Sequence, residues 1–239
     1  MWRISMSAVV FLIAMHSPIC KSSEPVAVEV SDSDARMIGV DCTGKLATRS
    51  HVDGDWRLVG GSCCVESVGI MPDGTLLGVG DDFQLYTKKT PNVGDWEGPV
   101  DGSCCIIDVA ARSDGSIVAV SKKKILLYRA DLSSEWVEAK KNTIEMVAVD
   151  VFPDGRILGV TKEGGLKVKD GLDVPWKSYK AKGVKVKDIS IQPDETVFGV
   201  GKKLGSLYVL NEGVWELIPE SDCVKSIVSP RDLIVRNDD

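Results

Sequence analysis

Short apolar segments separated by polar turns run through most of the chain. Segments such as MVAVDVF (Met146–Phe152) and RILGV (Arg156–Val160) hold apolar residues in alternation or in a row, and Val is prominent. This pattern is typical of β-strands rather than of amphipathic helices, whose apolar positions recur every three or four residues. Asp154 and Gly155 separate the two segments, and Asp-Gly favours a tight turn because Gly accepts a positive φ. The pair therefore predicts a β-hairpin.

This hairpin belongs to a unit of about forty residues that returns five times. The valine that ends the second strand recurs at steps of 39 to 41 residues, at Val40, Val79, Val120, Val160 and Val200. A tryptophan follows at steps of 39 or 40 residues, at Trp56, Trp96, Trp136, Trp176 and Trp215. An aspartate stands six residues before each valine, at Asp34, Asp73, Asp114, Asp154 and Asp194. Regular self-similarity of this length is the signature of a repeat architecture.

Each unit has room for four strands and no helix. After the hairpin, segments such as LYT, LYR and LYV predict a third strand, and the Trp segment predicts a fourth. Four-stranded units at this period indicate an all-β protein, a β-propeller in which each unit is one blade. The small residue before each valine suits a crowded position near the central channel, and these residues are Gly39, Gly78, Ala119, Gly159 and Gly199.

The number of blades depends on the C-terminal segment. CVKSIVSPRDLIVR (Cys223–Arg236) resembles the inner hairpin once more, without its turn glycine. The inner pair then occurs six times, which favours six blades. We expect the last blade to be incomplete or completed by the N-terminal segment, and five blades are the alternative.

The N-terminal residues resemble a secretory signal peptide. Arg3 precedes an apolar run, Ala8–Met15, which is shorter than the roughly 20 residues that span a bilayer. We therefore expect a signal peptide at residues 1–23, a single propeller domain at 24–239, a secreted and extracellular protein, and no transmembrane segment. The net charge of −6 offers no general attraction for nucleic acid.

Export also determines how the cysteines are interpreted. Six of them follow the expected cleavage region: Cys42, Cys63, Cys64, Cys104, Cys105 and Cys223. An even number in an oxidising compartment favours disulfides, although six cysteines allow 15 pairings. The adjacent cysteines lack the spacing of a zinc site. We expect bonds between equivalent positions of neighbouring blades, with Cys223 helping to close the ring, and we consider a vicinal Cys63–Cys64 bond less favourable because it is strained.

The repeat also resembles a known family. The unit DGTLLGVGDDFQLYTKKT, followed by DW, is similar to the tectonin repeat of fish-egg lectins and more distantly to the repeats of tachylectin-type lectins. The resemblance extends from about Val26 to Val235. It implies a lectin that binds simple sugars or glycans of microbial or egg surfaces, without catalysis or cofactor, in innate immunity, eggs or extracellular matrix. The paired-cysteine motif GSCC departs from the family pattern, so sugar specificity is not transferred.

The repeated tryptophans are the candidate carbohydrate-binding residues. An indole can stack on the apolar face of a sugar, and several weak sites on one ring would raise avidity. The alternative is that Trp56, Trp96, Trp136, Trp176 and Trp215 are hydrophobic plugs between blades, which packing would require in every unit. The repeated aspartates are interpreted as turn residues.

A run of lysines is the candidate surface for an anionic partner. Lys167 and Lys169, like Lys185 and Lys187, stand two residues apart, which places each pair on one face of a strand. Such a strip could bind anionic polysaccharide or lipopolysaccharide, or could be a solvated edge.

The sequence contains few of the residues that common catalytic sites require. Once the signal peptide is removed, His51 is the sole histidine, which disfavours a Ser-His-Asp site or a histidine-rich metal centre. We expect a non-enzymatic lectin with no metal and no cofactor. The alternatives are an extracellular protein-binding or matrix propeller and, more weakly, a metal-dependent lactone hydrolase.

Overall fold

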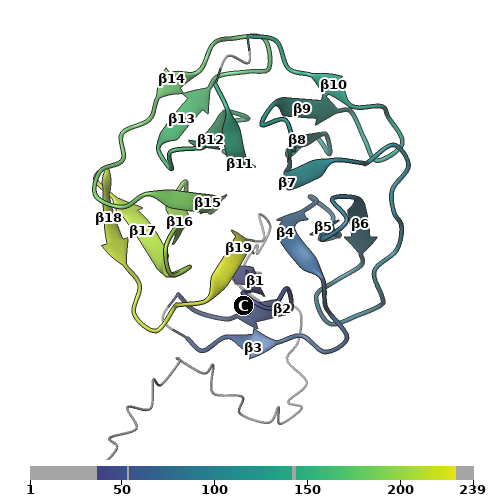
Figure 1. Ribbon diagram of the computed structural model, residues 1–239, viewed down its shortest axis with the longest axis horizontal. Helices are drawn as coiled ribbons and strands as arrows, with labels where there is room; N and C mark the ends of the chain where they lie inside the picture. Colours follow the sequence, from purple (N-terminus) through teal and green to yellow (C-terminus); the bar gives the residue numbers. More distant parts are fainter. Residues whose placement is uncertain (1–36, 53, 142–143, 230–239) are drawn as a thin grey trace, which may run out of the picture.

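The chain forms a ring of antiparallel sheets around a central axis (Figure 1). This computed structural model describes residues 37–52, 54–141 and 144–229. The expected signal peptide, 1–23, lies outside the described residues. Within those ranges, no helix has the length and apolar character needed to cross a membrane.

Five sheets make up the ring. The strands are β1 (Met37–Asp41), β2 (Leu46–Arg49), β3 (Arg57–Leu58), β4 (Val65–Ile70), β5 (Leu76–Gly80), β6 (Leu85–Lys88), β7 (Ile106–Ala111), β8 (Ile117–Ser121), β9 (Leu126–Arg129), β10 (Val137–Glu138), β11 (Met146–Val151), β12 (Ile157–Thr161), β13 (Leu166–Lys169), β14 (Lys177–Ser178), β15 (Val186–Ile191), β16 (Val197–Gly201), β17 (Leu207–Asn211), β18 (Val214–Leu217) and β19 (Val224–Val228). From the channel outward, blade 1 holds β19, β1, β2 and β3, blade 2 holds β4 to β6, blade 3 holds β7 to β10, blade 4 holds β11 to β14, and blade 5 holds β15 to β18.

Burial falls from the axis to the rim of each blade. The second strands, such as β8 and β12, are buried along their whole length, whereas β3, β10 and β14 are exposed. A strand covered on both faces by neighbouring blades requires apolar residues at successive positions, which explains the Val-rich runs. Each pair of adjacent blades encloses one apolar cluster, five in all among the described residues.

Ring closure corrects the expected number of blades from six to five. The C-terminal strand β19 pairs antiparallel with β1, from Ile38 opposite Val228 to Asp41 opposite Val224, and becomes the innermost strand of blade 1. The sixth hairpin-like segment therefore begins no new blade. Its second half, from residue 230 onward, lies outside the described residues.

One disulfide holds this closure. Cys42 follows β1, Cys223 precedes β19, and the two residues are bonded with their Cα atoms 5.0 Å apart. The expected role of Cys223 in closing the ring is confirmed. The expected bonds between neighbouring blades are wrong, because Cys42 and Cys223 border strands of the same blade and the other bond joins the adjacent residues Cys104 and Cys105.

The repeated aspartates serve the turns between first and second strands. Their Oδ1 atoms accept hydrogen bonds from the backbone N–H two residues on, at Asp73, Asp114, Asp154 and Asp194. This confirms their interpretation as turn residues, since a side chain that caps its own turn stabilises it whatever the function. Asp34 lies outside the described residues.

Side chains on the innermost strands join the blades across the channel. An innermost strand has an edge with no neighbouring strand, and its N–H groups need acceptors. Polar side chains of the adjacent blade supply these acceptors. At one junction, two polar side chains from neighbouring blades form a hydrogen bond with each other instead. The bonds run from Val68 N–H to Ser226, from Ser67 to Asp108, from Val149 N–H to Asp108, from Ile191 N–H to Asp150 and from Ile227 N–H to Asp188. All five junctions between blades are bridged in this way.

The channel carboxyl groups are fully buried and close to one another. Asp108, Asp150 and Asp188 border a cavity of about 10 Å³. Burial, together with the charge of Asp188, raises the pKa of Asp108 well above its usual value. Burial, together with the charge of Asp150, raises the pKa of Asp188 to about 7. The folded ring therefore holds protons that the unfolded chain has released.

The raised pKa values of the channel carboxyl groups predict that the protein loses stability as the pH rises from 5 to 8. A carboxyl group whose pKa is raised by folding favours the folded state at low pH, and that contribution is lost as the pH passes its folded pKa. Urea unfolding should show the free energy of unfolding falling by up to about 1 kcal/mol per pH unit for each such group. Asp188→Asn should flatten the slope, whereas Asp194→Asn, a change in an exposed turn, should not. Equal slopes in all three proteins would contradict the assignment.

The closing disulfide predicts a second effect on stability. Cys42 and Cys223 are 181 residues apart in sequence, so their bond restricts the unfolded chain strongly. Replacing both with Ser should lower the free energy of unfolding by about 3 kcal/mol in urea titrations. The matched control replaces both Cys104 and Cys105, whose bond joins no distant segments. It should lower the free energy of unfolding by less than about 1 kcal/mol. Equal losses would contradict the closing role.

Candidate functional site

The five tryptophans occupy equivalent places between adjacent blades. Each indole packs against the apolar cluster between its own blade and the preceding one. In blades 1, 2, 4 and 5 its six-membered ring lies over the glycine before the repeated valine: a Cβ added at Gly78 would lie 2.4 Å from Trp96 Cη2, and one at Gly199 would lie 2.7 Å from Trp215 Cη2. The expectation that the channel requires these small residues is therefore wrong, because the space is taken by the tryptophan of the same blade.

Exposure separates these tryptophans into two groups. Trp176 is 9% and Trp215 6% exposed, which makes them parts of the core. Trp56, Trp96 and Trp136 are partly exposed, and their indole N–H groups are buried without a hydrogen-bond partner among the described residues. The five tryptophans therefore do not offer equal surfaces to a ligand.

A buried cation accompanies the tryptophan in several blades. At the end of the third strand, Arg49 lies over Trp56, Arg129 over Trp136 and Lys169 over Trp176, at 5.0 to 5.5 Å from the ring centres. The equivalent residue in blade 2, Lys88, instead donates to the carbonyl of Gly94. The sequence analysis did not predict that these cations pack on tryptophan, although a basic residue ends LATR, LYTK, LLYR and LKVK.

Lys169 must be removed from the candidate anionic patch. It is fully buried, and its ammonium group donates to the carbonyl of Lys140 at 2.7 Å. Burial lowers its pKa. Lys167 bonds Ser178, Lys187 is half-buried in the innermost strand β15, and Lys185 is exposed. The strip on one strand face is thus not formed as a continuous surface.

Blade 2 has an open pocket beside its tryptophan. The pocket has a volume of about 140 Å³ and includes Trp96, Tyr86, Asp82, Cys63 and Cys64 in its lining. Blade 2 differs from the other blades in its outer part, because β4 to β6 are followed only by a single bridge between Thr87 and Glu97. Gly78 and Gly80 also line the pocket, and Gly78 lies directly under the indole of Trp96.

The polar groups of this pocket form a short network. Tyr86 donates its hydroxyl proton to Asp82 Oδ2 at 2.7 Å, and Gln84 donates to both Asp82 oxygens. The hydrogen bond from Tyr86, followed by that from the Gln84 backbone, lowers the pKa of Asp82. The same bond raises the pKa of Tyr86. At neutral pH the pocket thus presents an ionised carboxylate and a protonated phenol beside an aromatic ring.

The two ends of the ring differ in character. Because strands alternate in direction, the turns between second and third strands and the loops that lead into each innermost strand lie at one end. The six cysteines of the described residues are all found there. We name this the cysteine end. Lysines gather there in blades 4 and 5: Lys202 N–H donates to the Lys185 carbonyl and Lys202 Nζ to that of Lys162. Lys162 also pairs with Glu145 at 3.1 Å.

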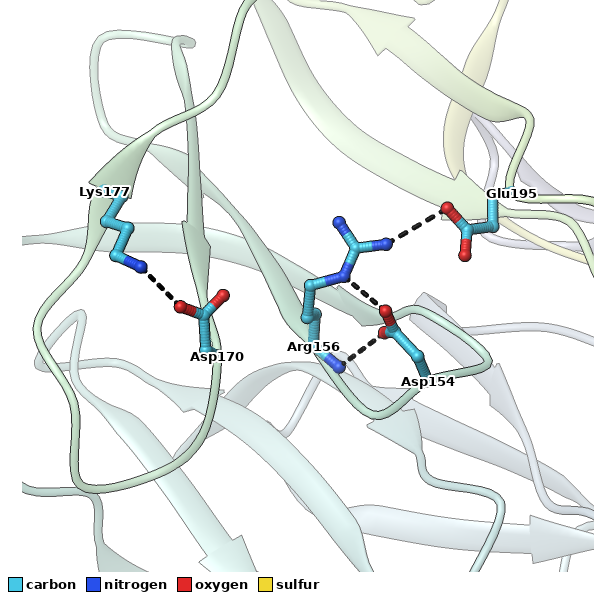
Figure 2. Close-up of polar contacts among 5 residues, drawn as sticks. All are labelled: Asp154, Arg156, Asp170, Lys177 and Glu195. Atoms are coloured by element: carbon cyan, nitrogen blue, oxygen red, sulfur yellow. Dashed lines mark hydrogen bonds and ion pairs between the residues drawn. The ribbon is translucent and has the colours of Figure 1, made fainter.

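The opposite end carries the aspartate turns and is partly neutralised. Figure 2 shows Arg156 between Asp154 of its own turn and Glu195 of the next blade, at 2.5 and 3.0 Å. Lys177 pairs with Asp170 at 2.5 Å in the same blade. The exposed carboxylates near Arg156 are therefore already paired with a cation. The blade 2 pocket, which places polar groups beside an aromatic ring, is the stronger candidate binding site.

Comparison with known proteins adds little to this picture. No protein-family model and no curated protein matches the chain. Among solved structures, one titled "YCF48 bound to D1 peptide" aligns with 15% identity and a TM-score of 0.43, over 78% of this chain and 64% of that one. At this level of similarity the match carries no statement about ligand or partner.

The packing of Trp96 on Gly78 predicts the effect of one added methyl group. Gly78→Ala should force the indole from its place and lower the free energy of unfolding by about 1–3 kcal/mol, as overpacking does. Gly171→Ala is the control, since no atom lies within 4 Å of the added Cβ, and it should change stability by less than about 0.5 kcal/mol. Urea unfolding measures both. A Gly78→Ala protein as stable as the wild type would contradict the described position of Trp96.

Proposed function

We propose that this protein binds carbohydrate without catalysis and that its principal site is the blade 2 pocket. The observation that carries the proposal is the partly exposed indole of Trp96 beside the Tyr86–Asp82 pair in an open pocket. Sugar-binding sites combine an aromatic face for the apolar side of the ring with fixed polar groups for its hydroxyls. The likeness of the repeat to tectonin repeats supports the same function.

The network in the pocket leaves hydrogen-bonding capacity for a ligand. Asp82 accepts three hydrogen bonds, two from Gln84 and one from Tyr86. The carboxylate is exposed and accepts hydrogen bonds only, so a sugar hydroxyl can reach it and donate to it. Bonds to an ionised acceptor are stronger than neutral ones. The lowered pKa of Asp82 keeps this acceptor charged at neutral pH.

The proposal places one main site on the ring instead of five equal ones. Trp176 and Trp215 are buried, and cations lie over Trp56 and Trp136. Avidity would then come from several chains on one surface rather than from several blades of one chain. Secretion is part of the proposal and is supported by the apolar run that follows Arg3.

The lysines of the cysteine end support a second candidate function. Lys162, Lys185 and Lys202 lie on adjoining turns, as their mutual hydrogen bonds require. A sulfated or phosphorylated polysaccharide, such as that of lipopolysaccharide, would match this charge. Such binding would weaken steeply with salt, whereas stacking on Trp96 would not.

A metal-dependent lactone hydrolase finds less support. The carboxylates of Asp108, Asp150 and Asp188 accept backbone hydrogen bonds between blades, and the cavity beside them is about 10 Å³. Within the described ranges, no three His, Cys, Asp or Glu side chains are grouped so as to hold a metal ion.

A glycan array with and without EDTA tests the proposed function. We expect the wild-type protein to bind a defined class of neutral sugars in both conditions and to be displaced by the free sugar. Trp96→Ala should weaken binding at least about tenfold, or about 1.4 kcal/mol. Trp136→Ala is the matched control and should bind as the wild type does, with folding of both variants checked by urea unfolding.

Other outcomes of the array would overturn the proposal. No binding at high protein concentration would reject the lectin function. Binding confined to anionic glycans, lost at high salt and insensitive to Trp96→Ala, would favour the lysines of the cysteine end. Loss with EDTA would favour a bound metal.

A further inference from the structure

Two identical tetrapeptides, GSCC, stand at equivalent places in the ring. The first, Gly61–Cys64, leads into blade 2, and the second, Gly102–Cys105, leads into blade 3. In the second copy the adjacent cysteines are joined in a disulfide, whereas Cys63 and Cys64 are exposed thiols. The same motif is therefore present in both redox states.

The backbone of the two copies is nearly the same. φ is 70° at Gly61 and 66° at Gly102, and 64° at Cys64 and 73° at Cys105. Adjacent Cα atoms lie only 3.8 Å apart, less than in ordinary disulfides, so bonding neighbours requires a special turn. The second GSCC shows that this turn accepts the bond.

The contacts that hold the two turns are also equivalent. Buried Ser62 accepts a hydrogen bond from Leu46 N–H, and buried Ser103 accepts one from Leu85 N–H, both at 3.0 Å. The Cys64 carbonyl accepts from Asp81 N–H at 2.9 Å, and that of Cys105 accepts from Lys122 N–H at 2.8 Å. Cys63 and Cys64 are thus held in the conformation in which Cys104 and Cys105 are bonded.

We infer that Cys63 and Cys64 form a reversible vicinal disulfide at the rim of the Trp96 pocket, by exchange with a small-molecule disulfide such as oxidised glutathione. Both residues contribute to the pocket lining, so the bond would change the rim that a ligand meets. The inference goes beyond the proposed function and does not depend on which ligand the pocket binds.

The exchange balances in two steps. The Cys64 thiolate attacks one sulfur of the small disulfide, forms a mixed disulfide and releases one thiolate. The Cys63 thiolate then attacks the Cys64 sulfur and releases the second small thiol. The two cysteines lose two electrons and two protons, and the small disulfide becomes two thiols. An excess of the small thiol reverses both steps.

The residue beside the second cysteine differs in charge between the two copies. Asp81 occupies the place beside Cys64 that Lys122 occupies beside Cys105. The hydrogen bond with Cys63, together with slight burial and the charges of Cys63 and Asp81, raises the pKa of Cys64. Because the thiolate is the attacking species, a raised pKa slows oxidation at neutral pH.

Redox titration with peptide mapping tests the inference. The purified protein is equilibrated at increasing ratios of oxidised to reduced glutathione, alkylated and cut with trypsin. Residues 58–88 contain only Cys63 and Cys64, and residues 90–112 contain only Cys104 and Cys105. We expect the first peptide to lose two hydrogens without gaining glutathione, and to regain them when the ratio is reversed.

Two charge-reversal variants test the role of Asp81. Asp81→Lys copies the surroundings of Cys105 and should speed bond formation roughly three- to tenfold. Glu138→Lys makes the same charge change in an exposed strand of blade 3 and should leave the rate unchanged. Stable glutathione adducts, pairing with another cysteine, or thiols that never oxidise would overturn the inference. Equal rates in both variants would overturn the role of Asp81. None of these readouts uses a glycan, so failure of the redox pair and failure of lectin function are separate results.

Discussion

The pairing of β19 with β1 is the contact on which the rest of the structure depends. A propeller blade buries its faces only against its neighbours, so an open ring would expose the apolar faces of its two end blades. Here the C-terminal strand supplies the innermost strand of the first blade, and Cys42–Cys223 bonds the two chain segments beside it. Asp188 and Ser226 then connect β19 to its neighbours through backbone N–H groups. Closure, rather than any single blade, makes the scaffold rigid.

A rigid ring lets one blade depart from the pattern. Blades 1, 3, 4 and 5 complete four strands, whereas blade 2 ends its ladder at a single bridge between Thr87 and Glu97. The same blade carries Gly80 and Tyr86 beside Trp96, and the pocket lies there. The tryptophan thus has one structural role in all blades, as part of the apolar cluster between adjacent blades. In blade 2 it also has an accessible surface that a ligand could use.

The repeat made the architecture predictable from the sequence. The features that depart from the repeat could not be predicted in the same way. The forty-residue period, the strand order and the turn aspartates follow from local pattern, which Asp73 and Asp114 confirm. The number of blades does not follow from local pattern, because a C-terminal strand has the same sequence pattern whether it begins a new blade or completes the first. Lys169 was expected to be exposed, because strand alternation cannot reveal that its ammonium group bonds the Lys140 carbonyl and lies over the Trp176 ring. The pocket depends on how Trp96, Tyr86 and the residues around Cys64 pack together, which no sequence motif predicts.

Hydrogen exchange of β19 followed by mass spectrometry tests ring closure most directly. Backbone amides exchange slowly only where the structure must open extensively to expose them. If β19 closes blade 1, the amides of Val224–Val228 that pair with β1 should be as protected as those of Val186–Ile191 in blade 5 and should exchange together with those of β1. Rapid exchange of β19 as a fraying chain end, beside a protected β1, would contradict the five-bladed closed ring.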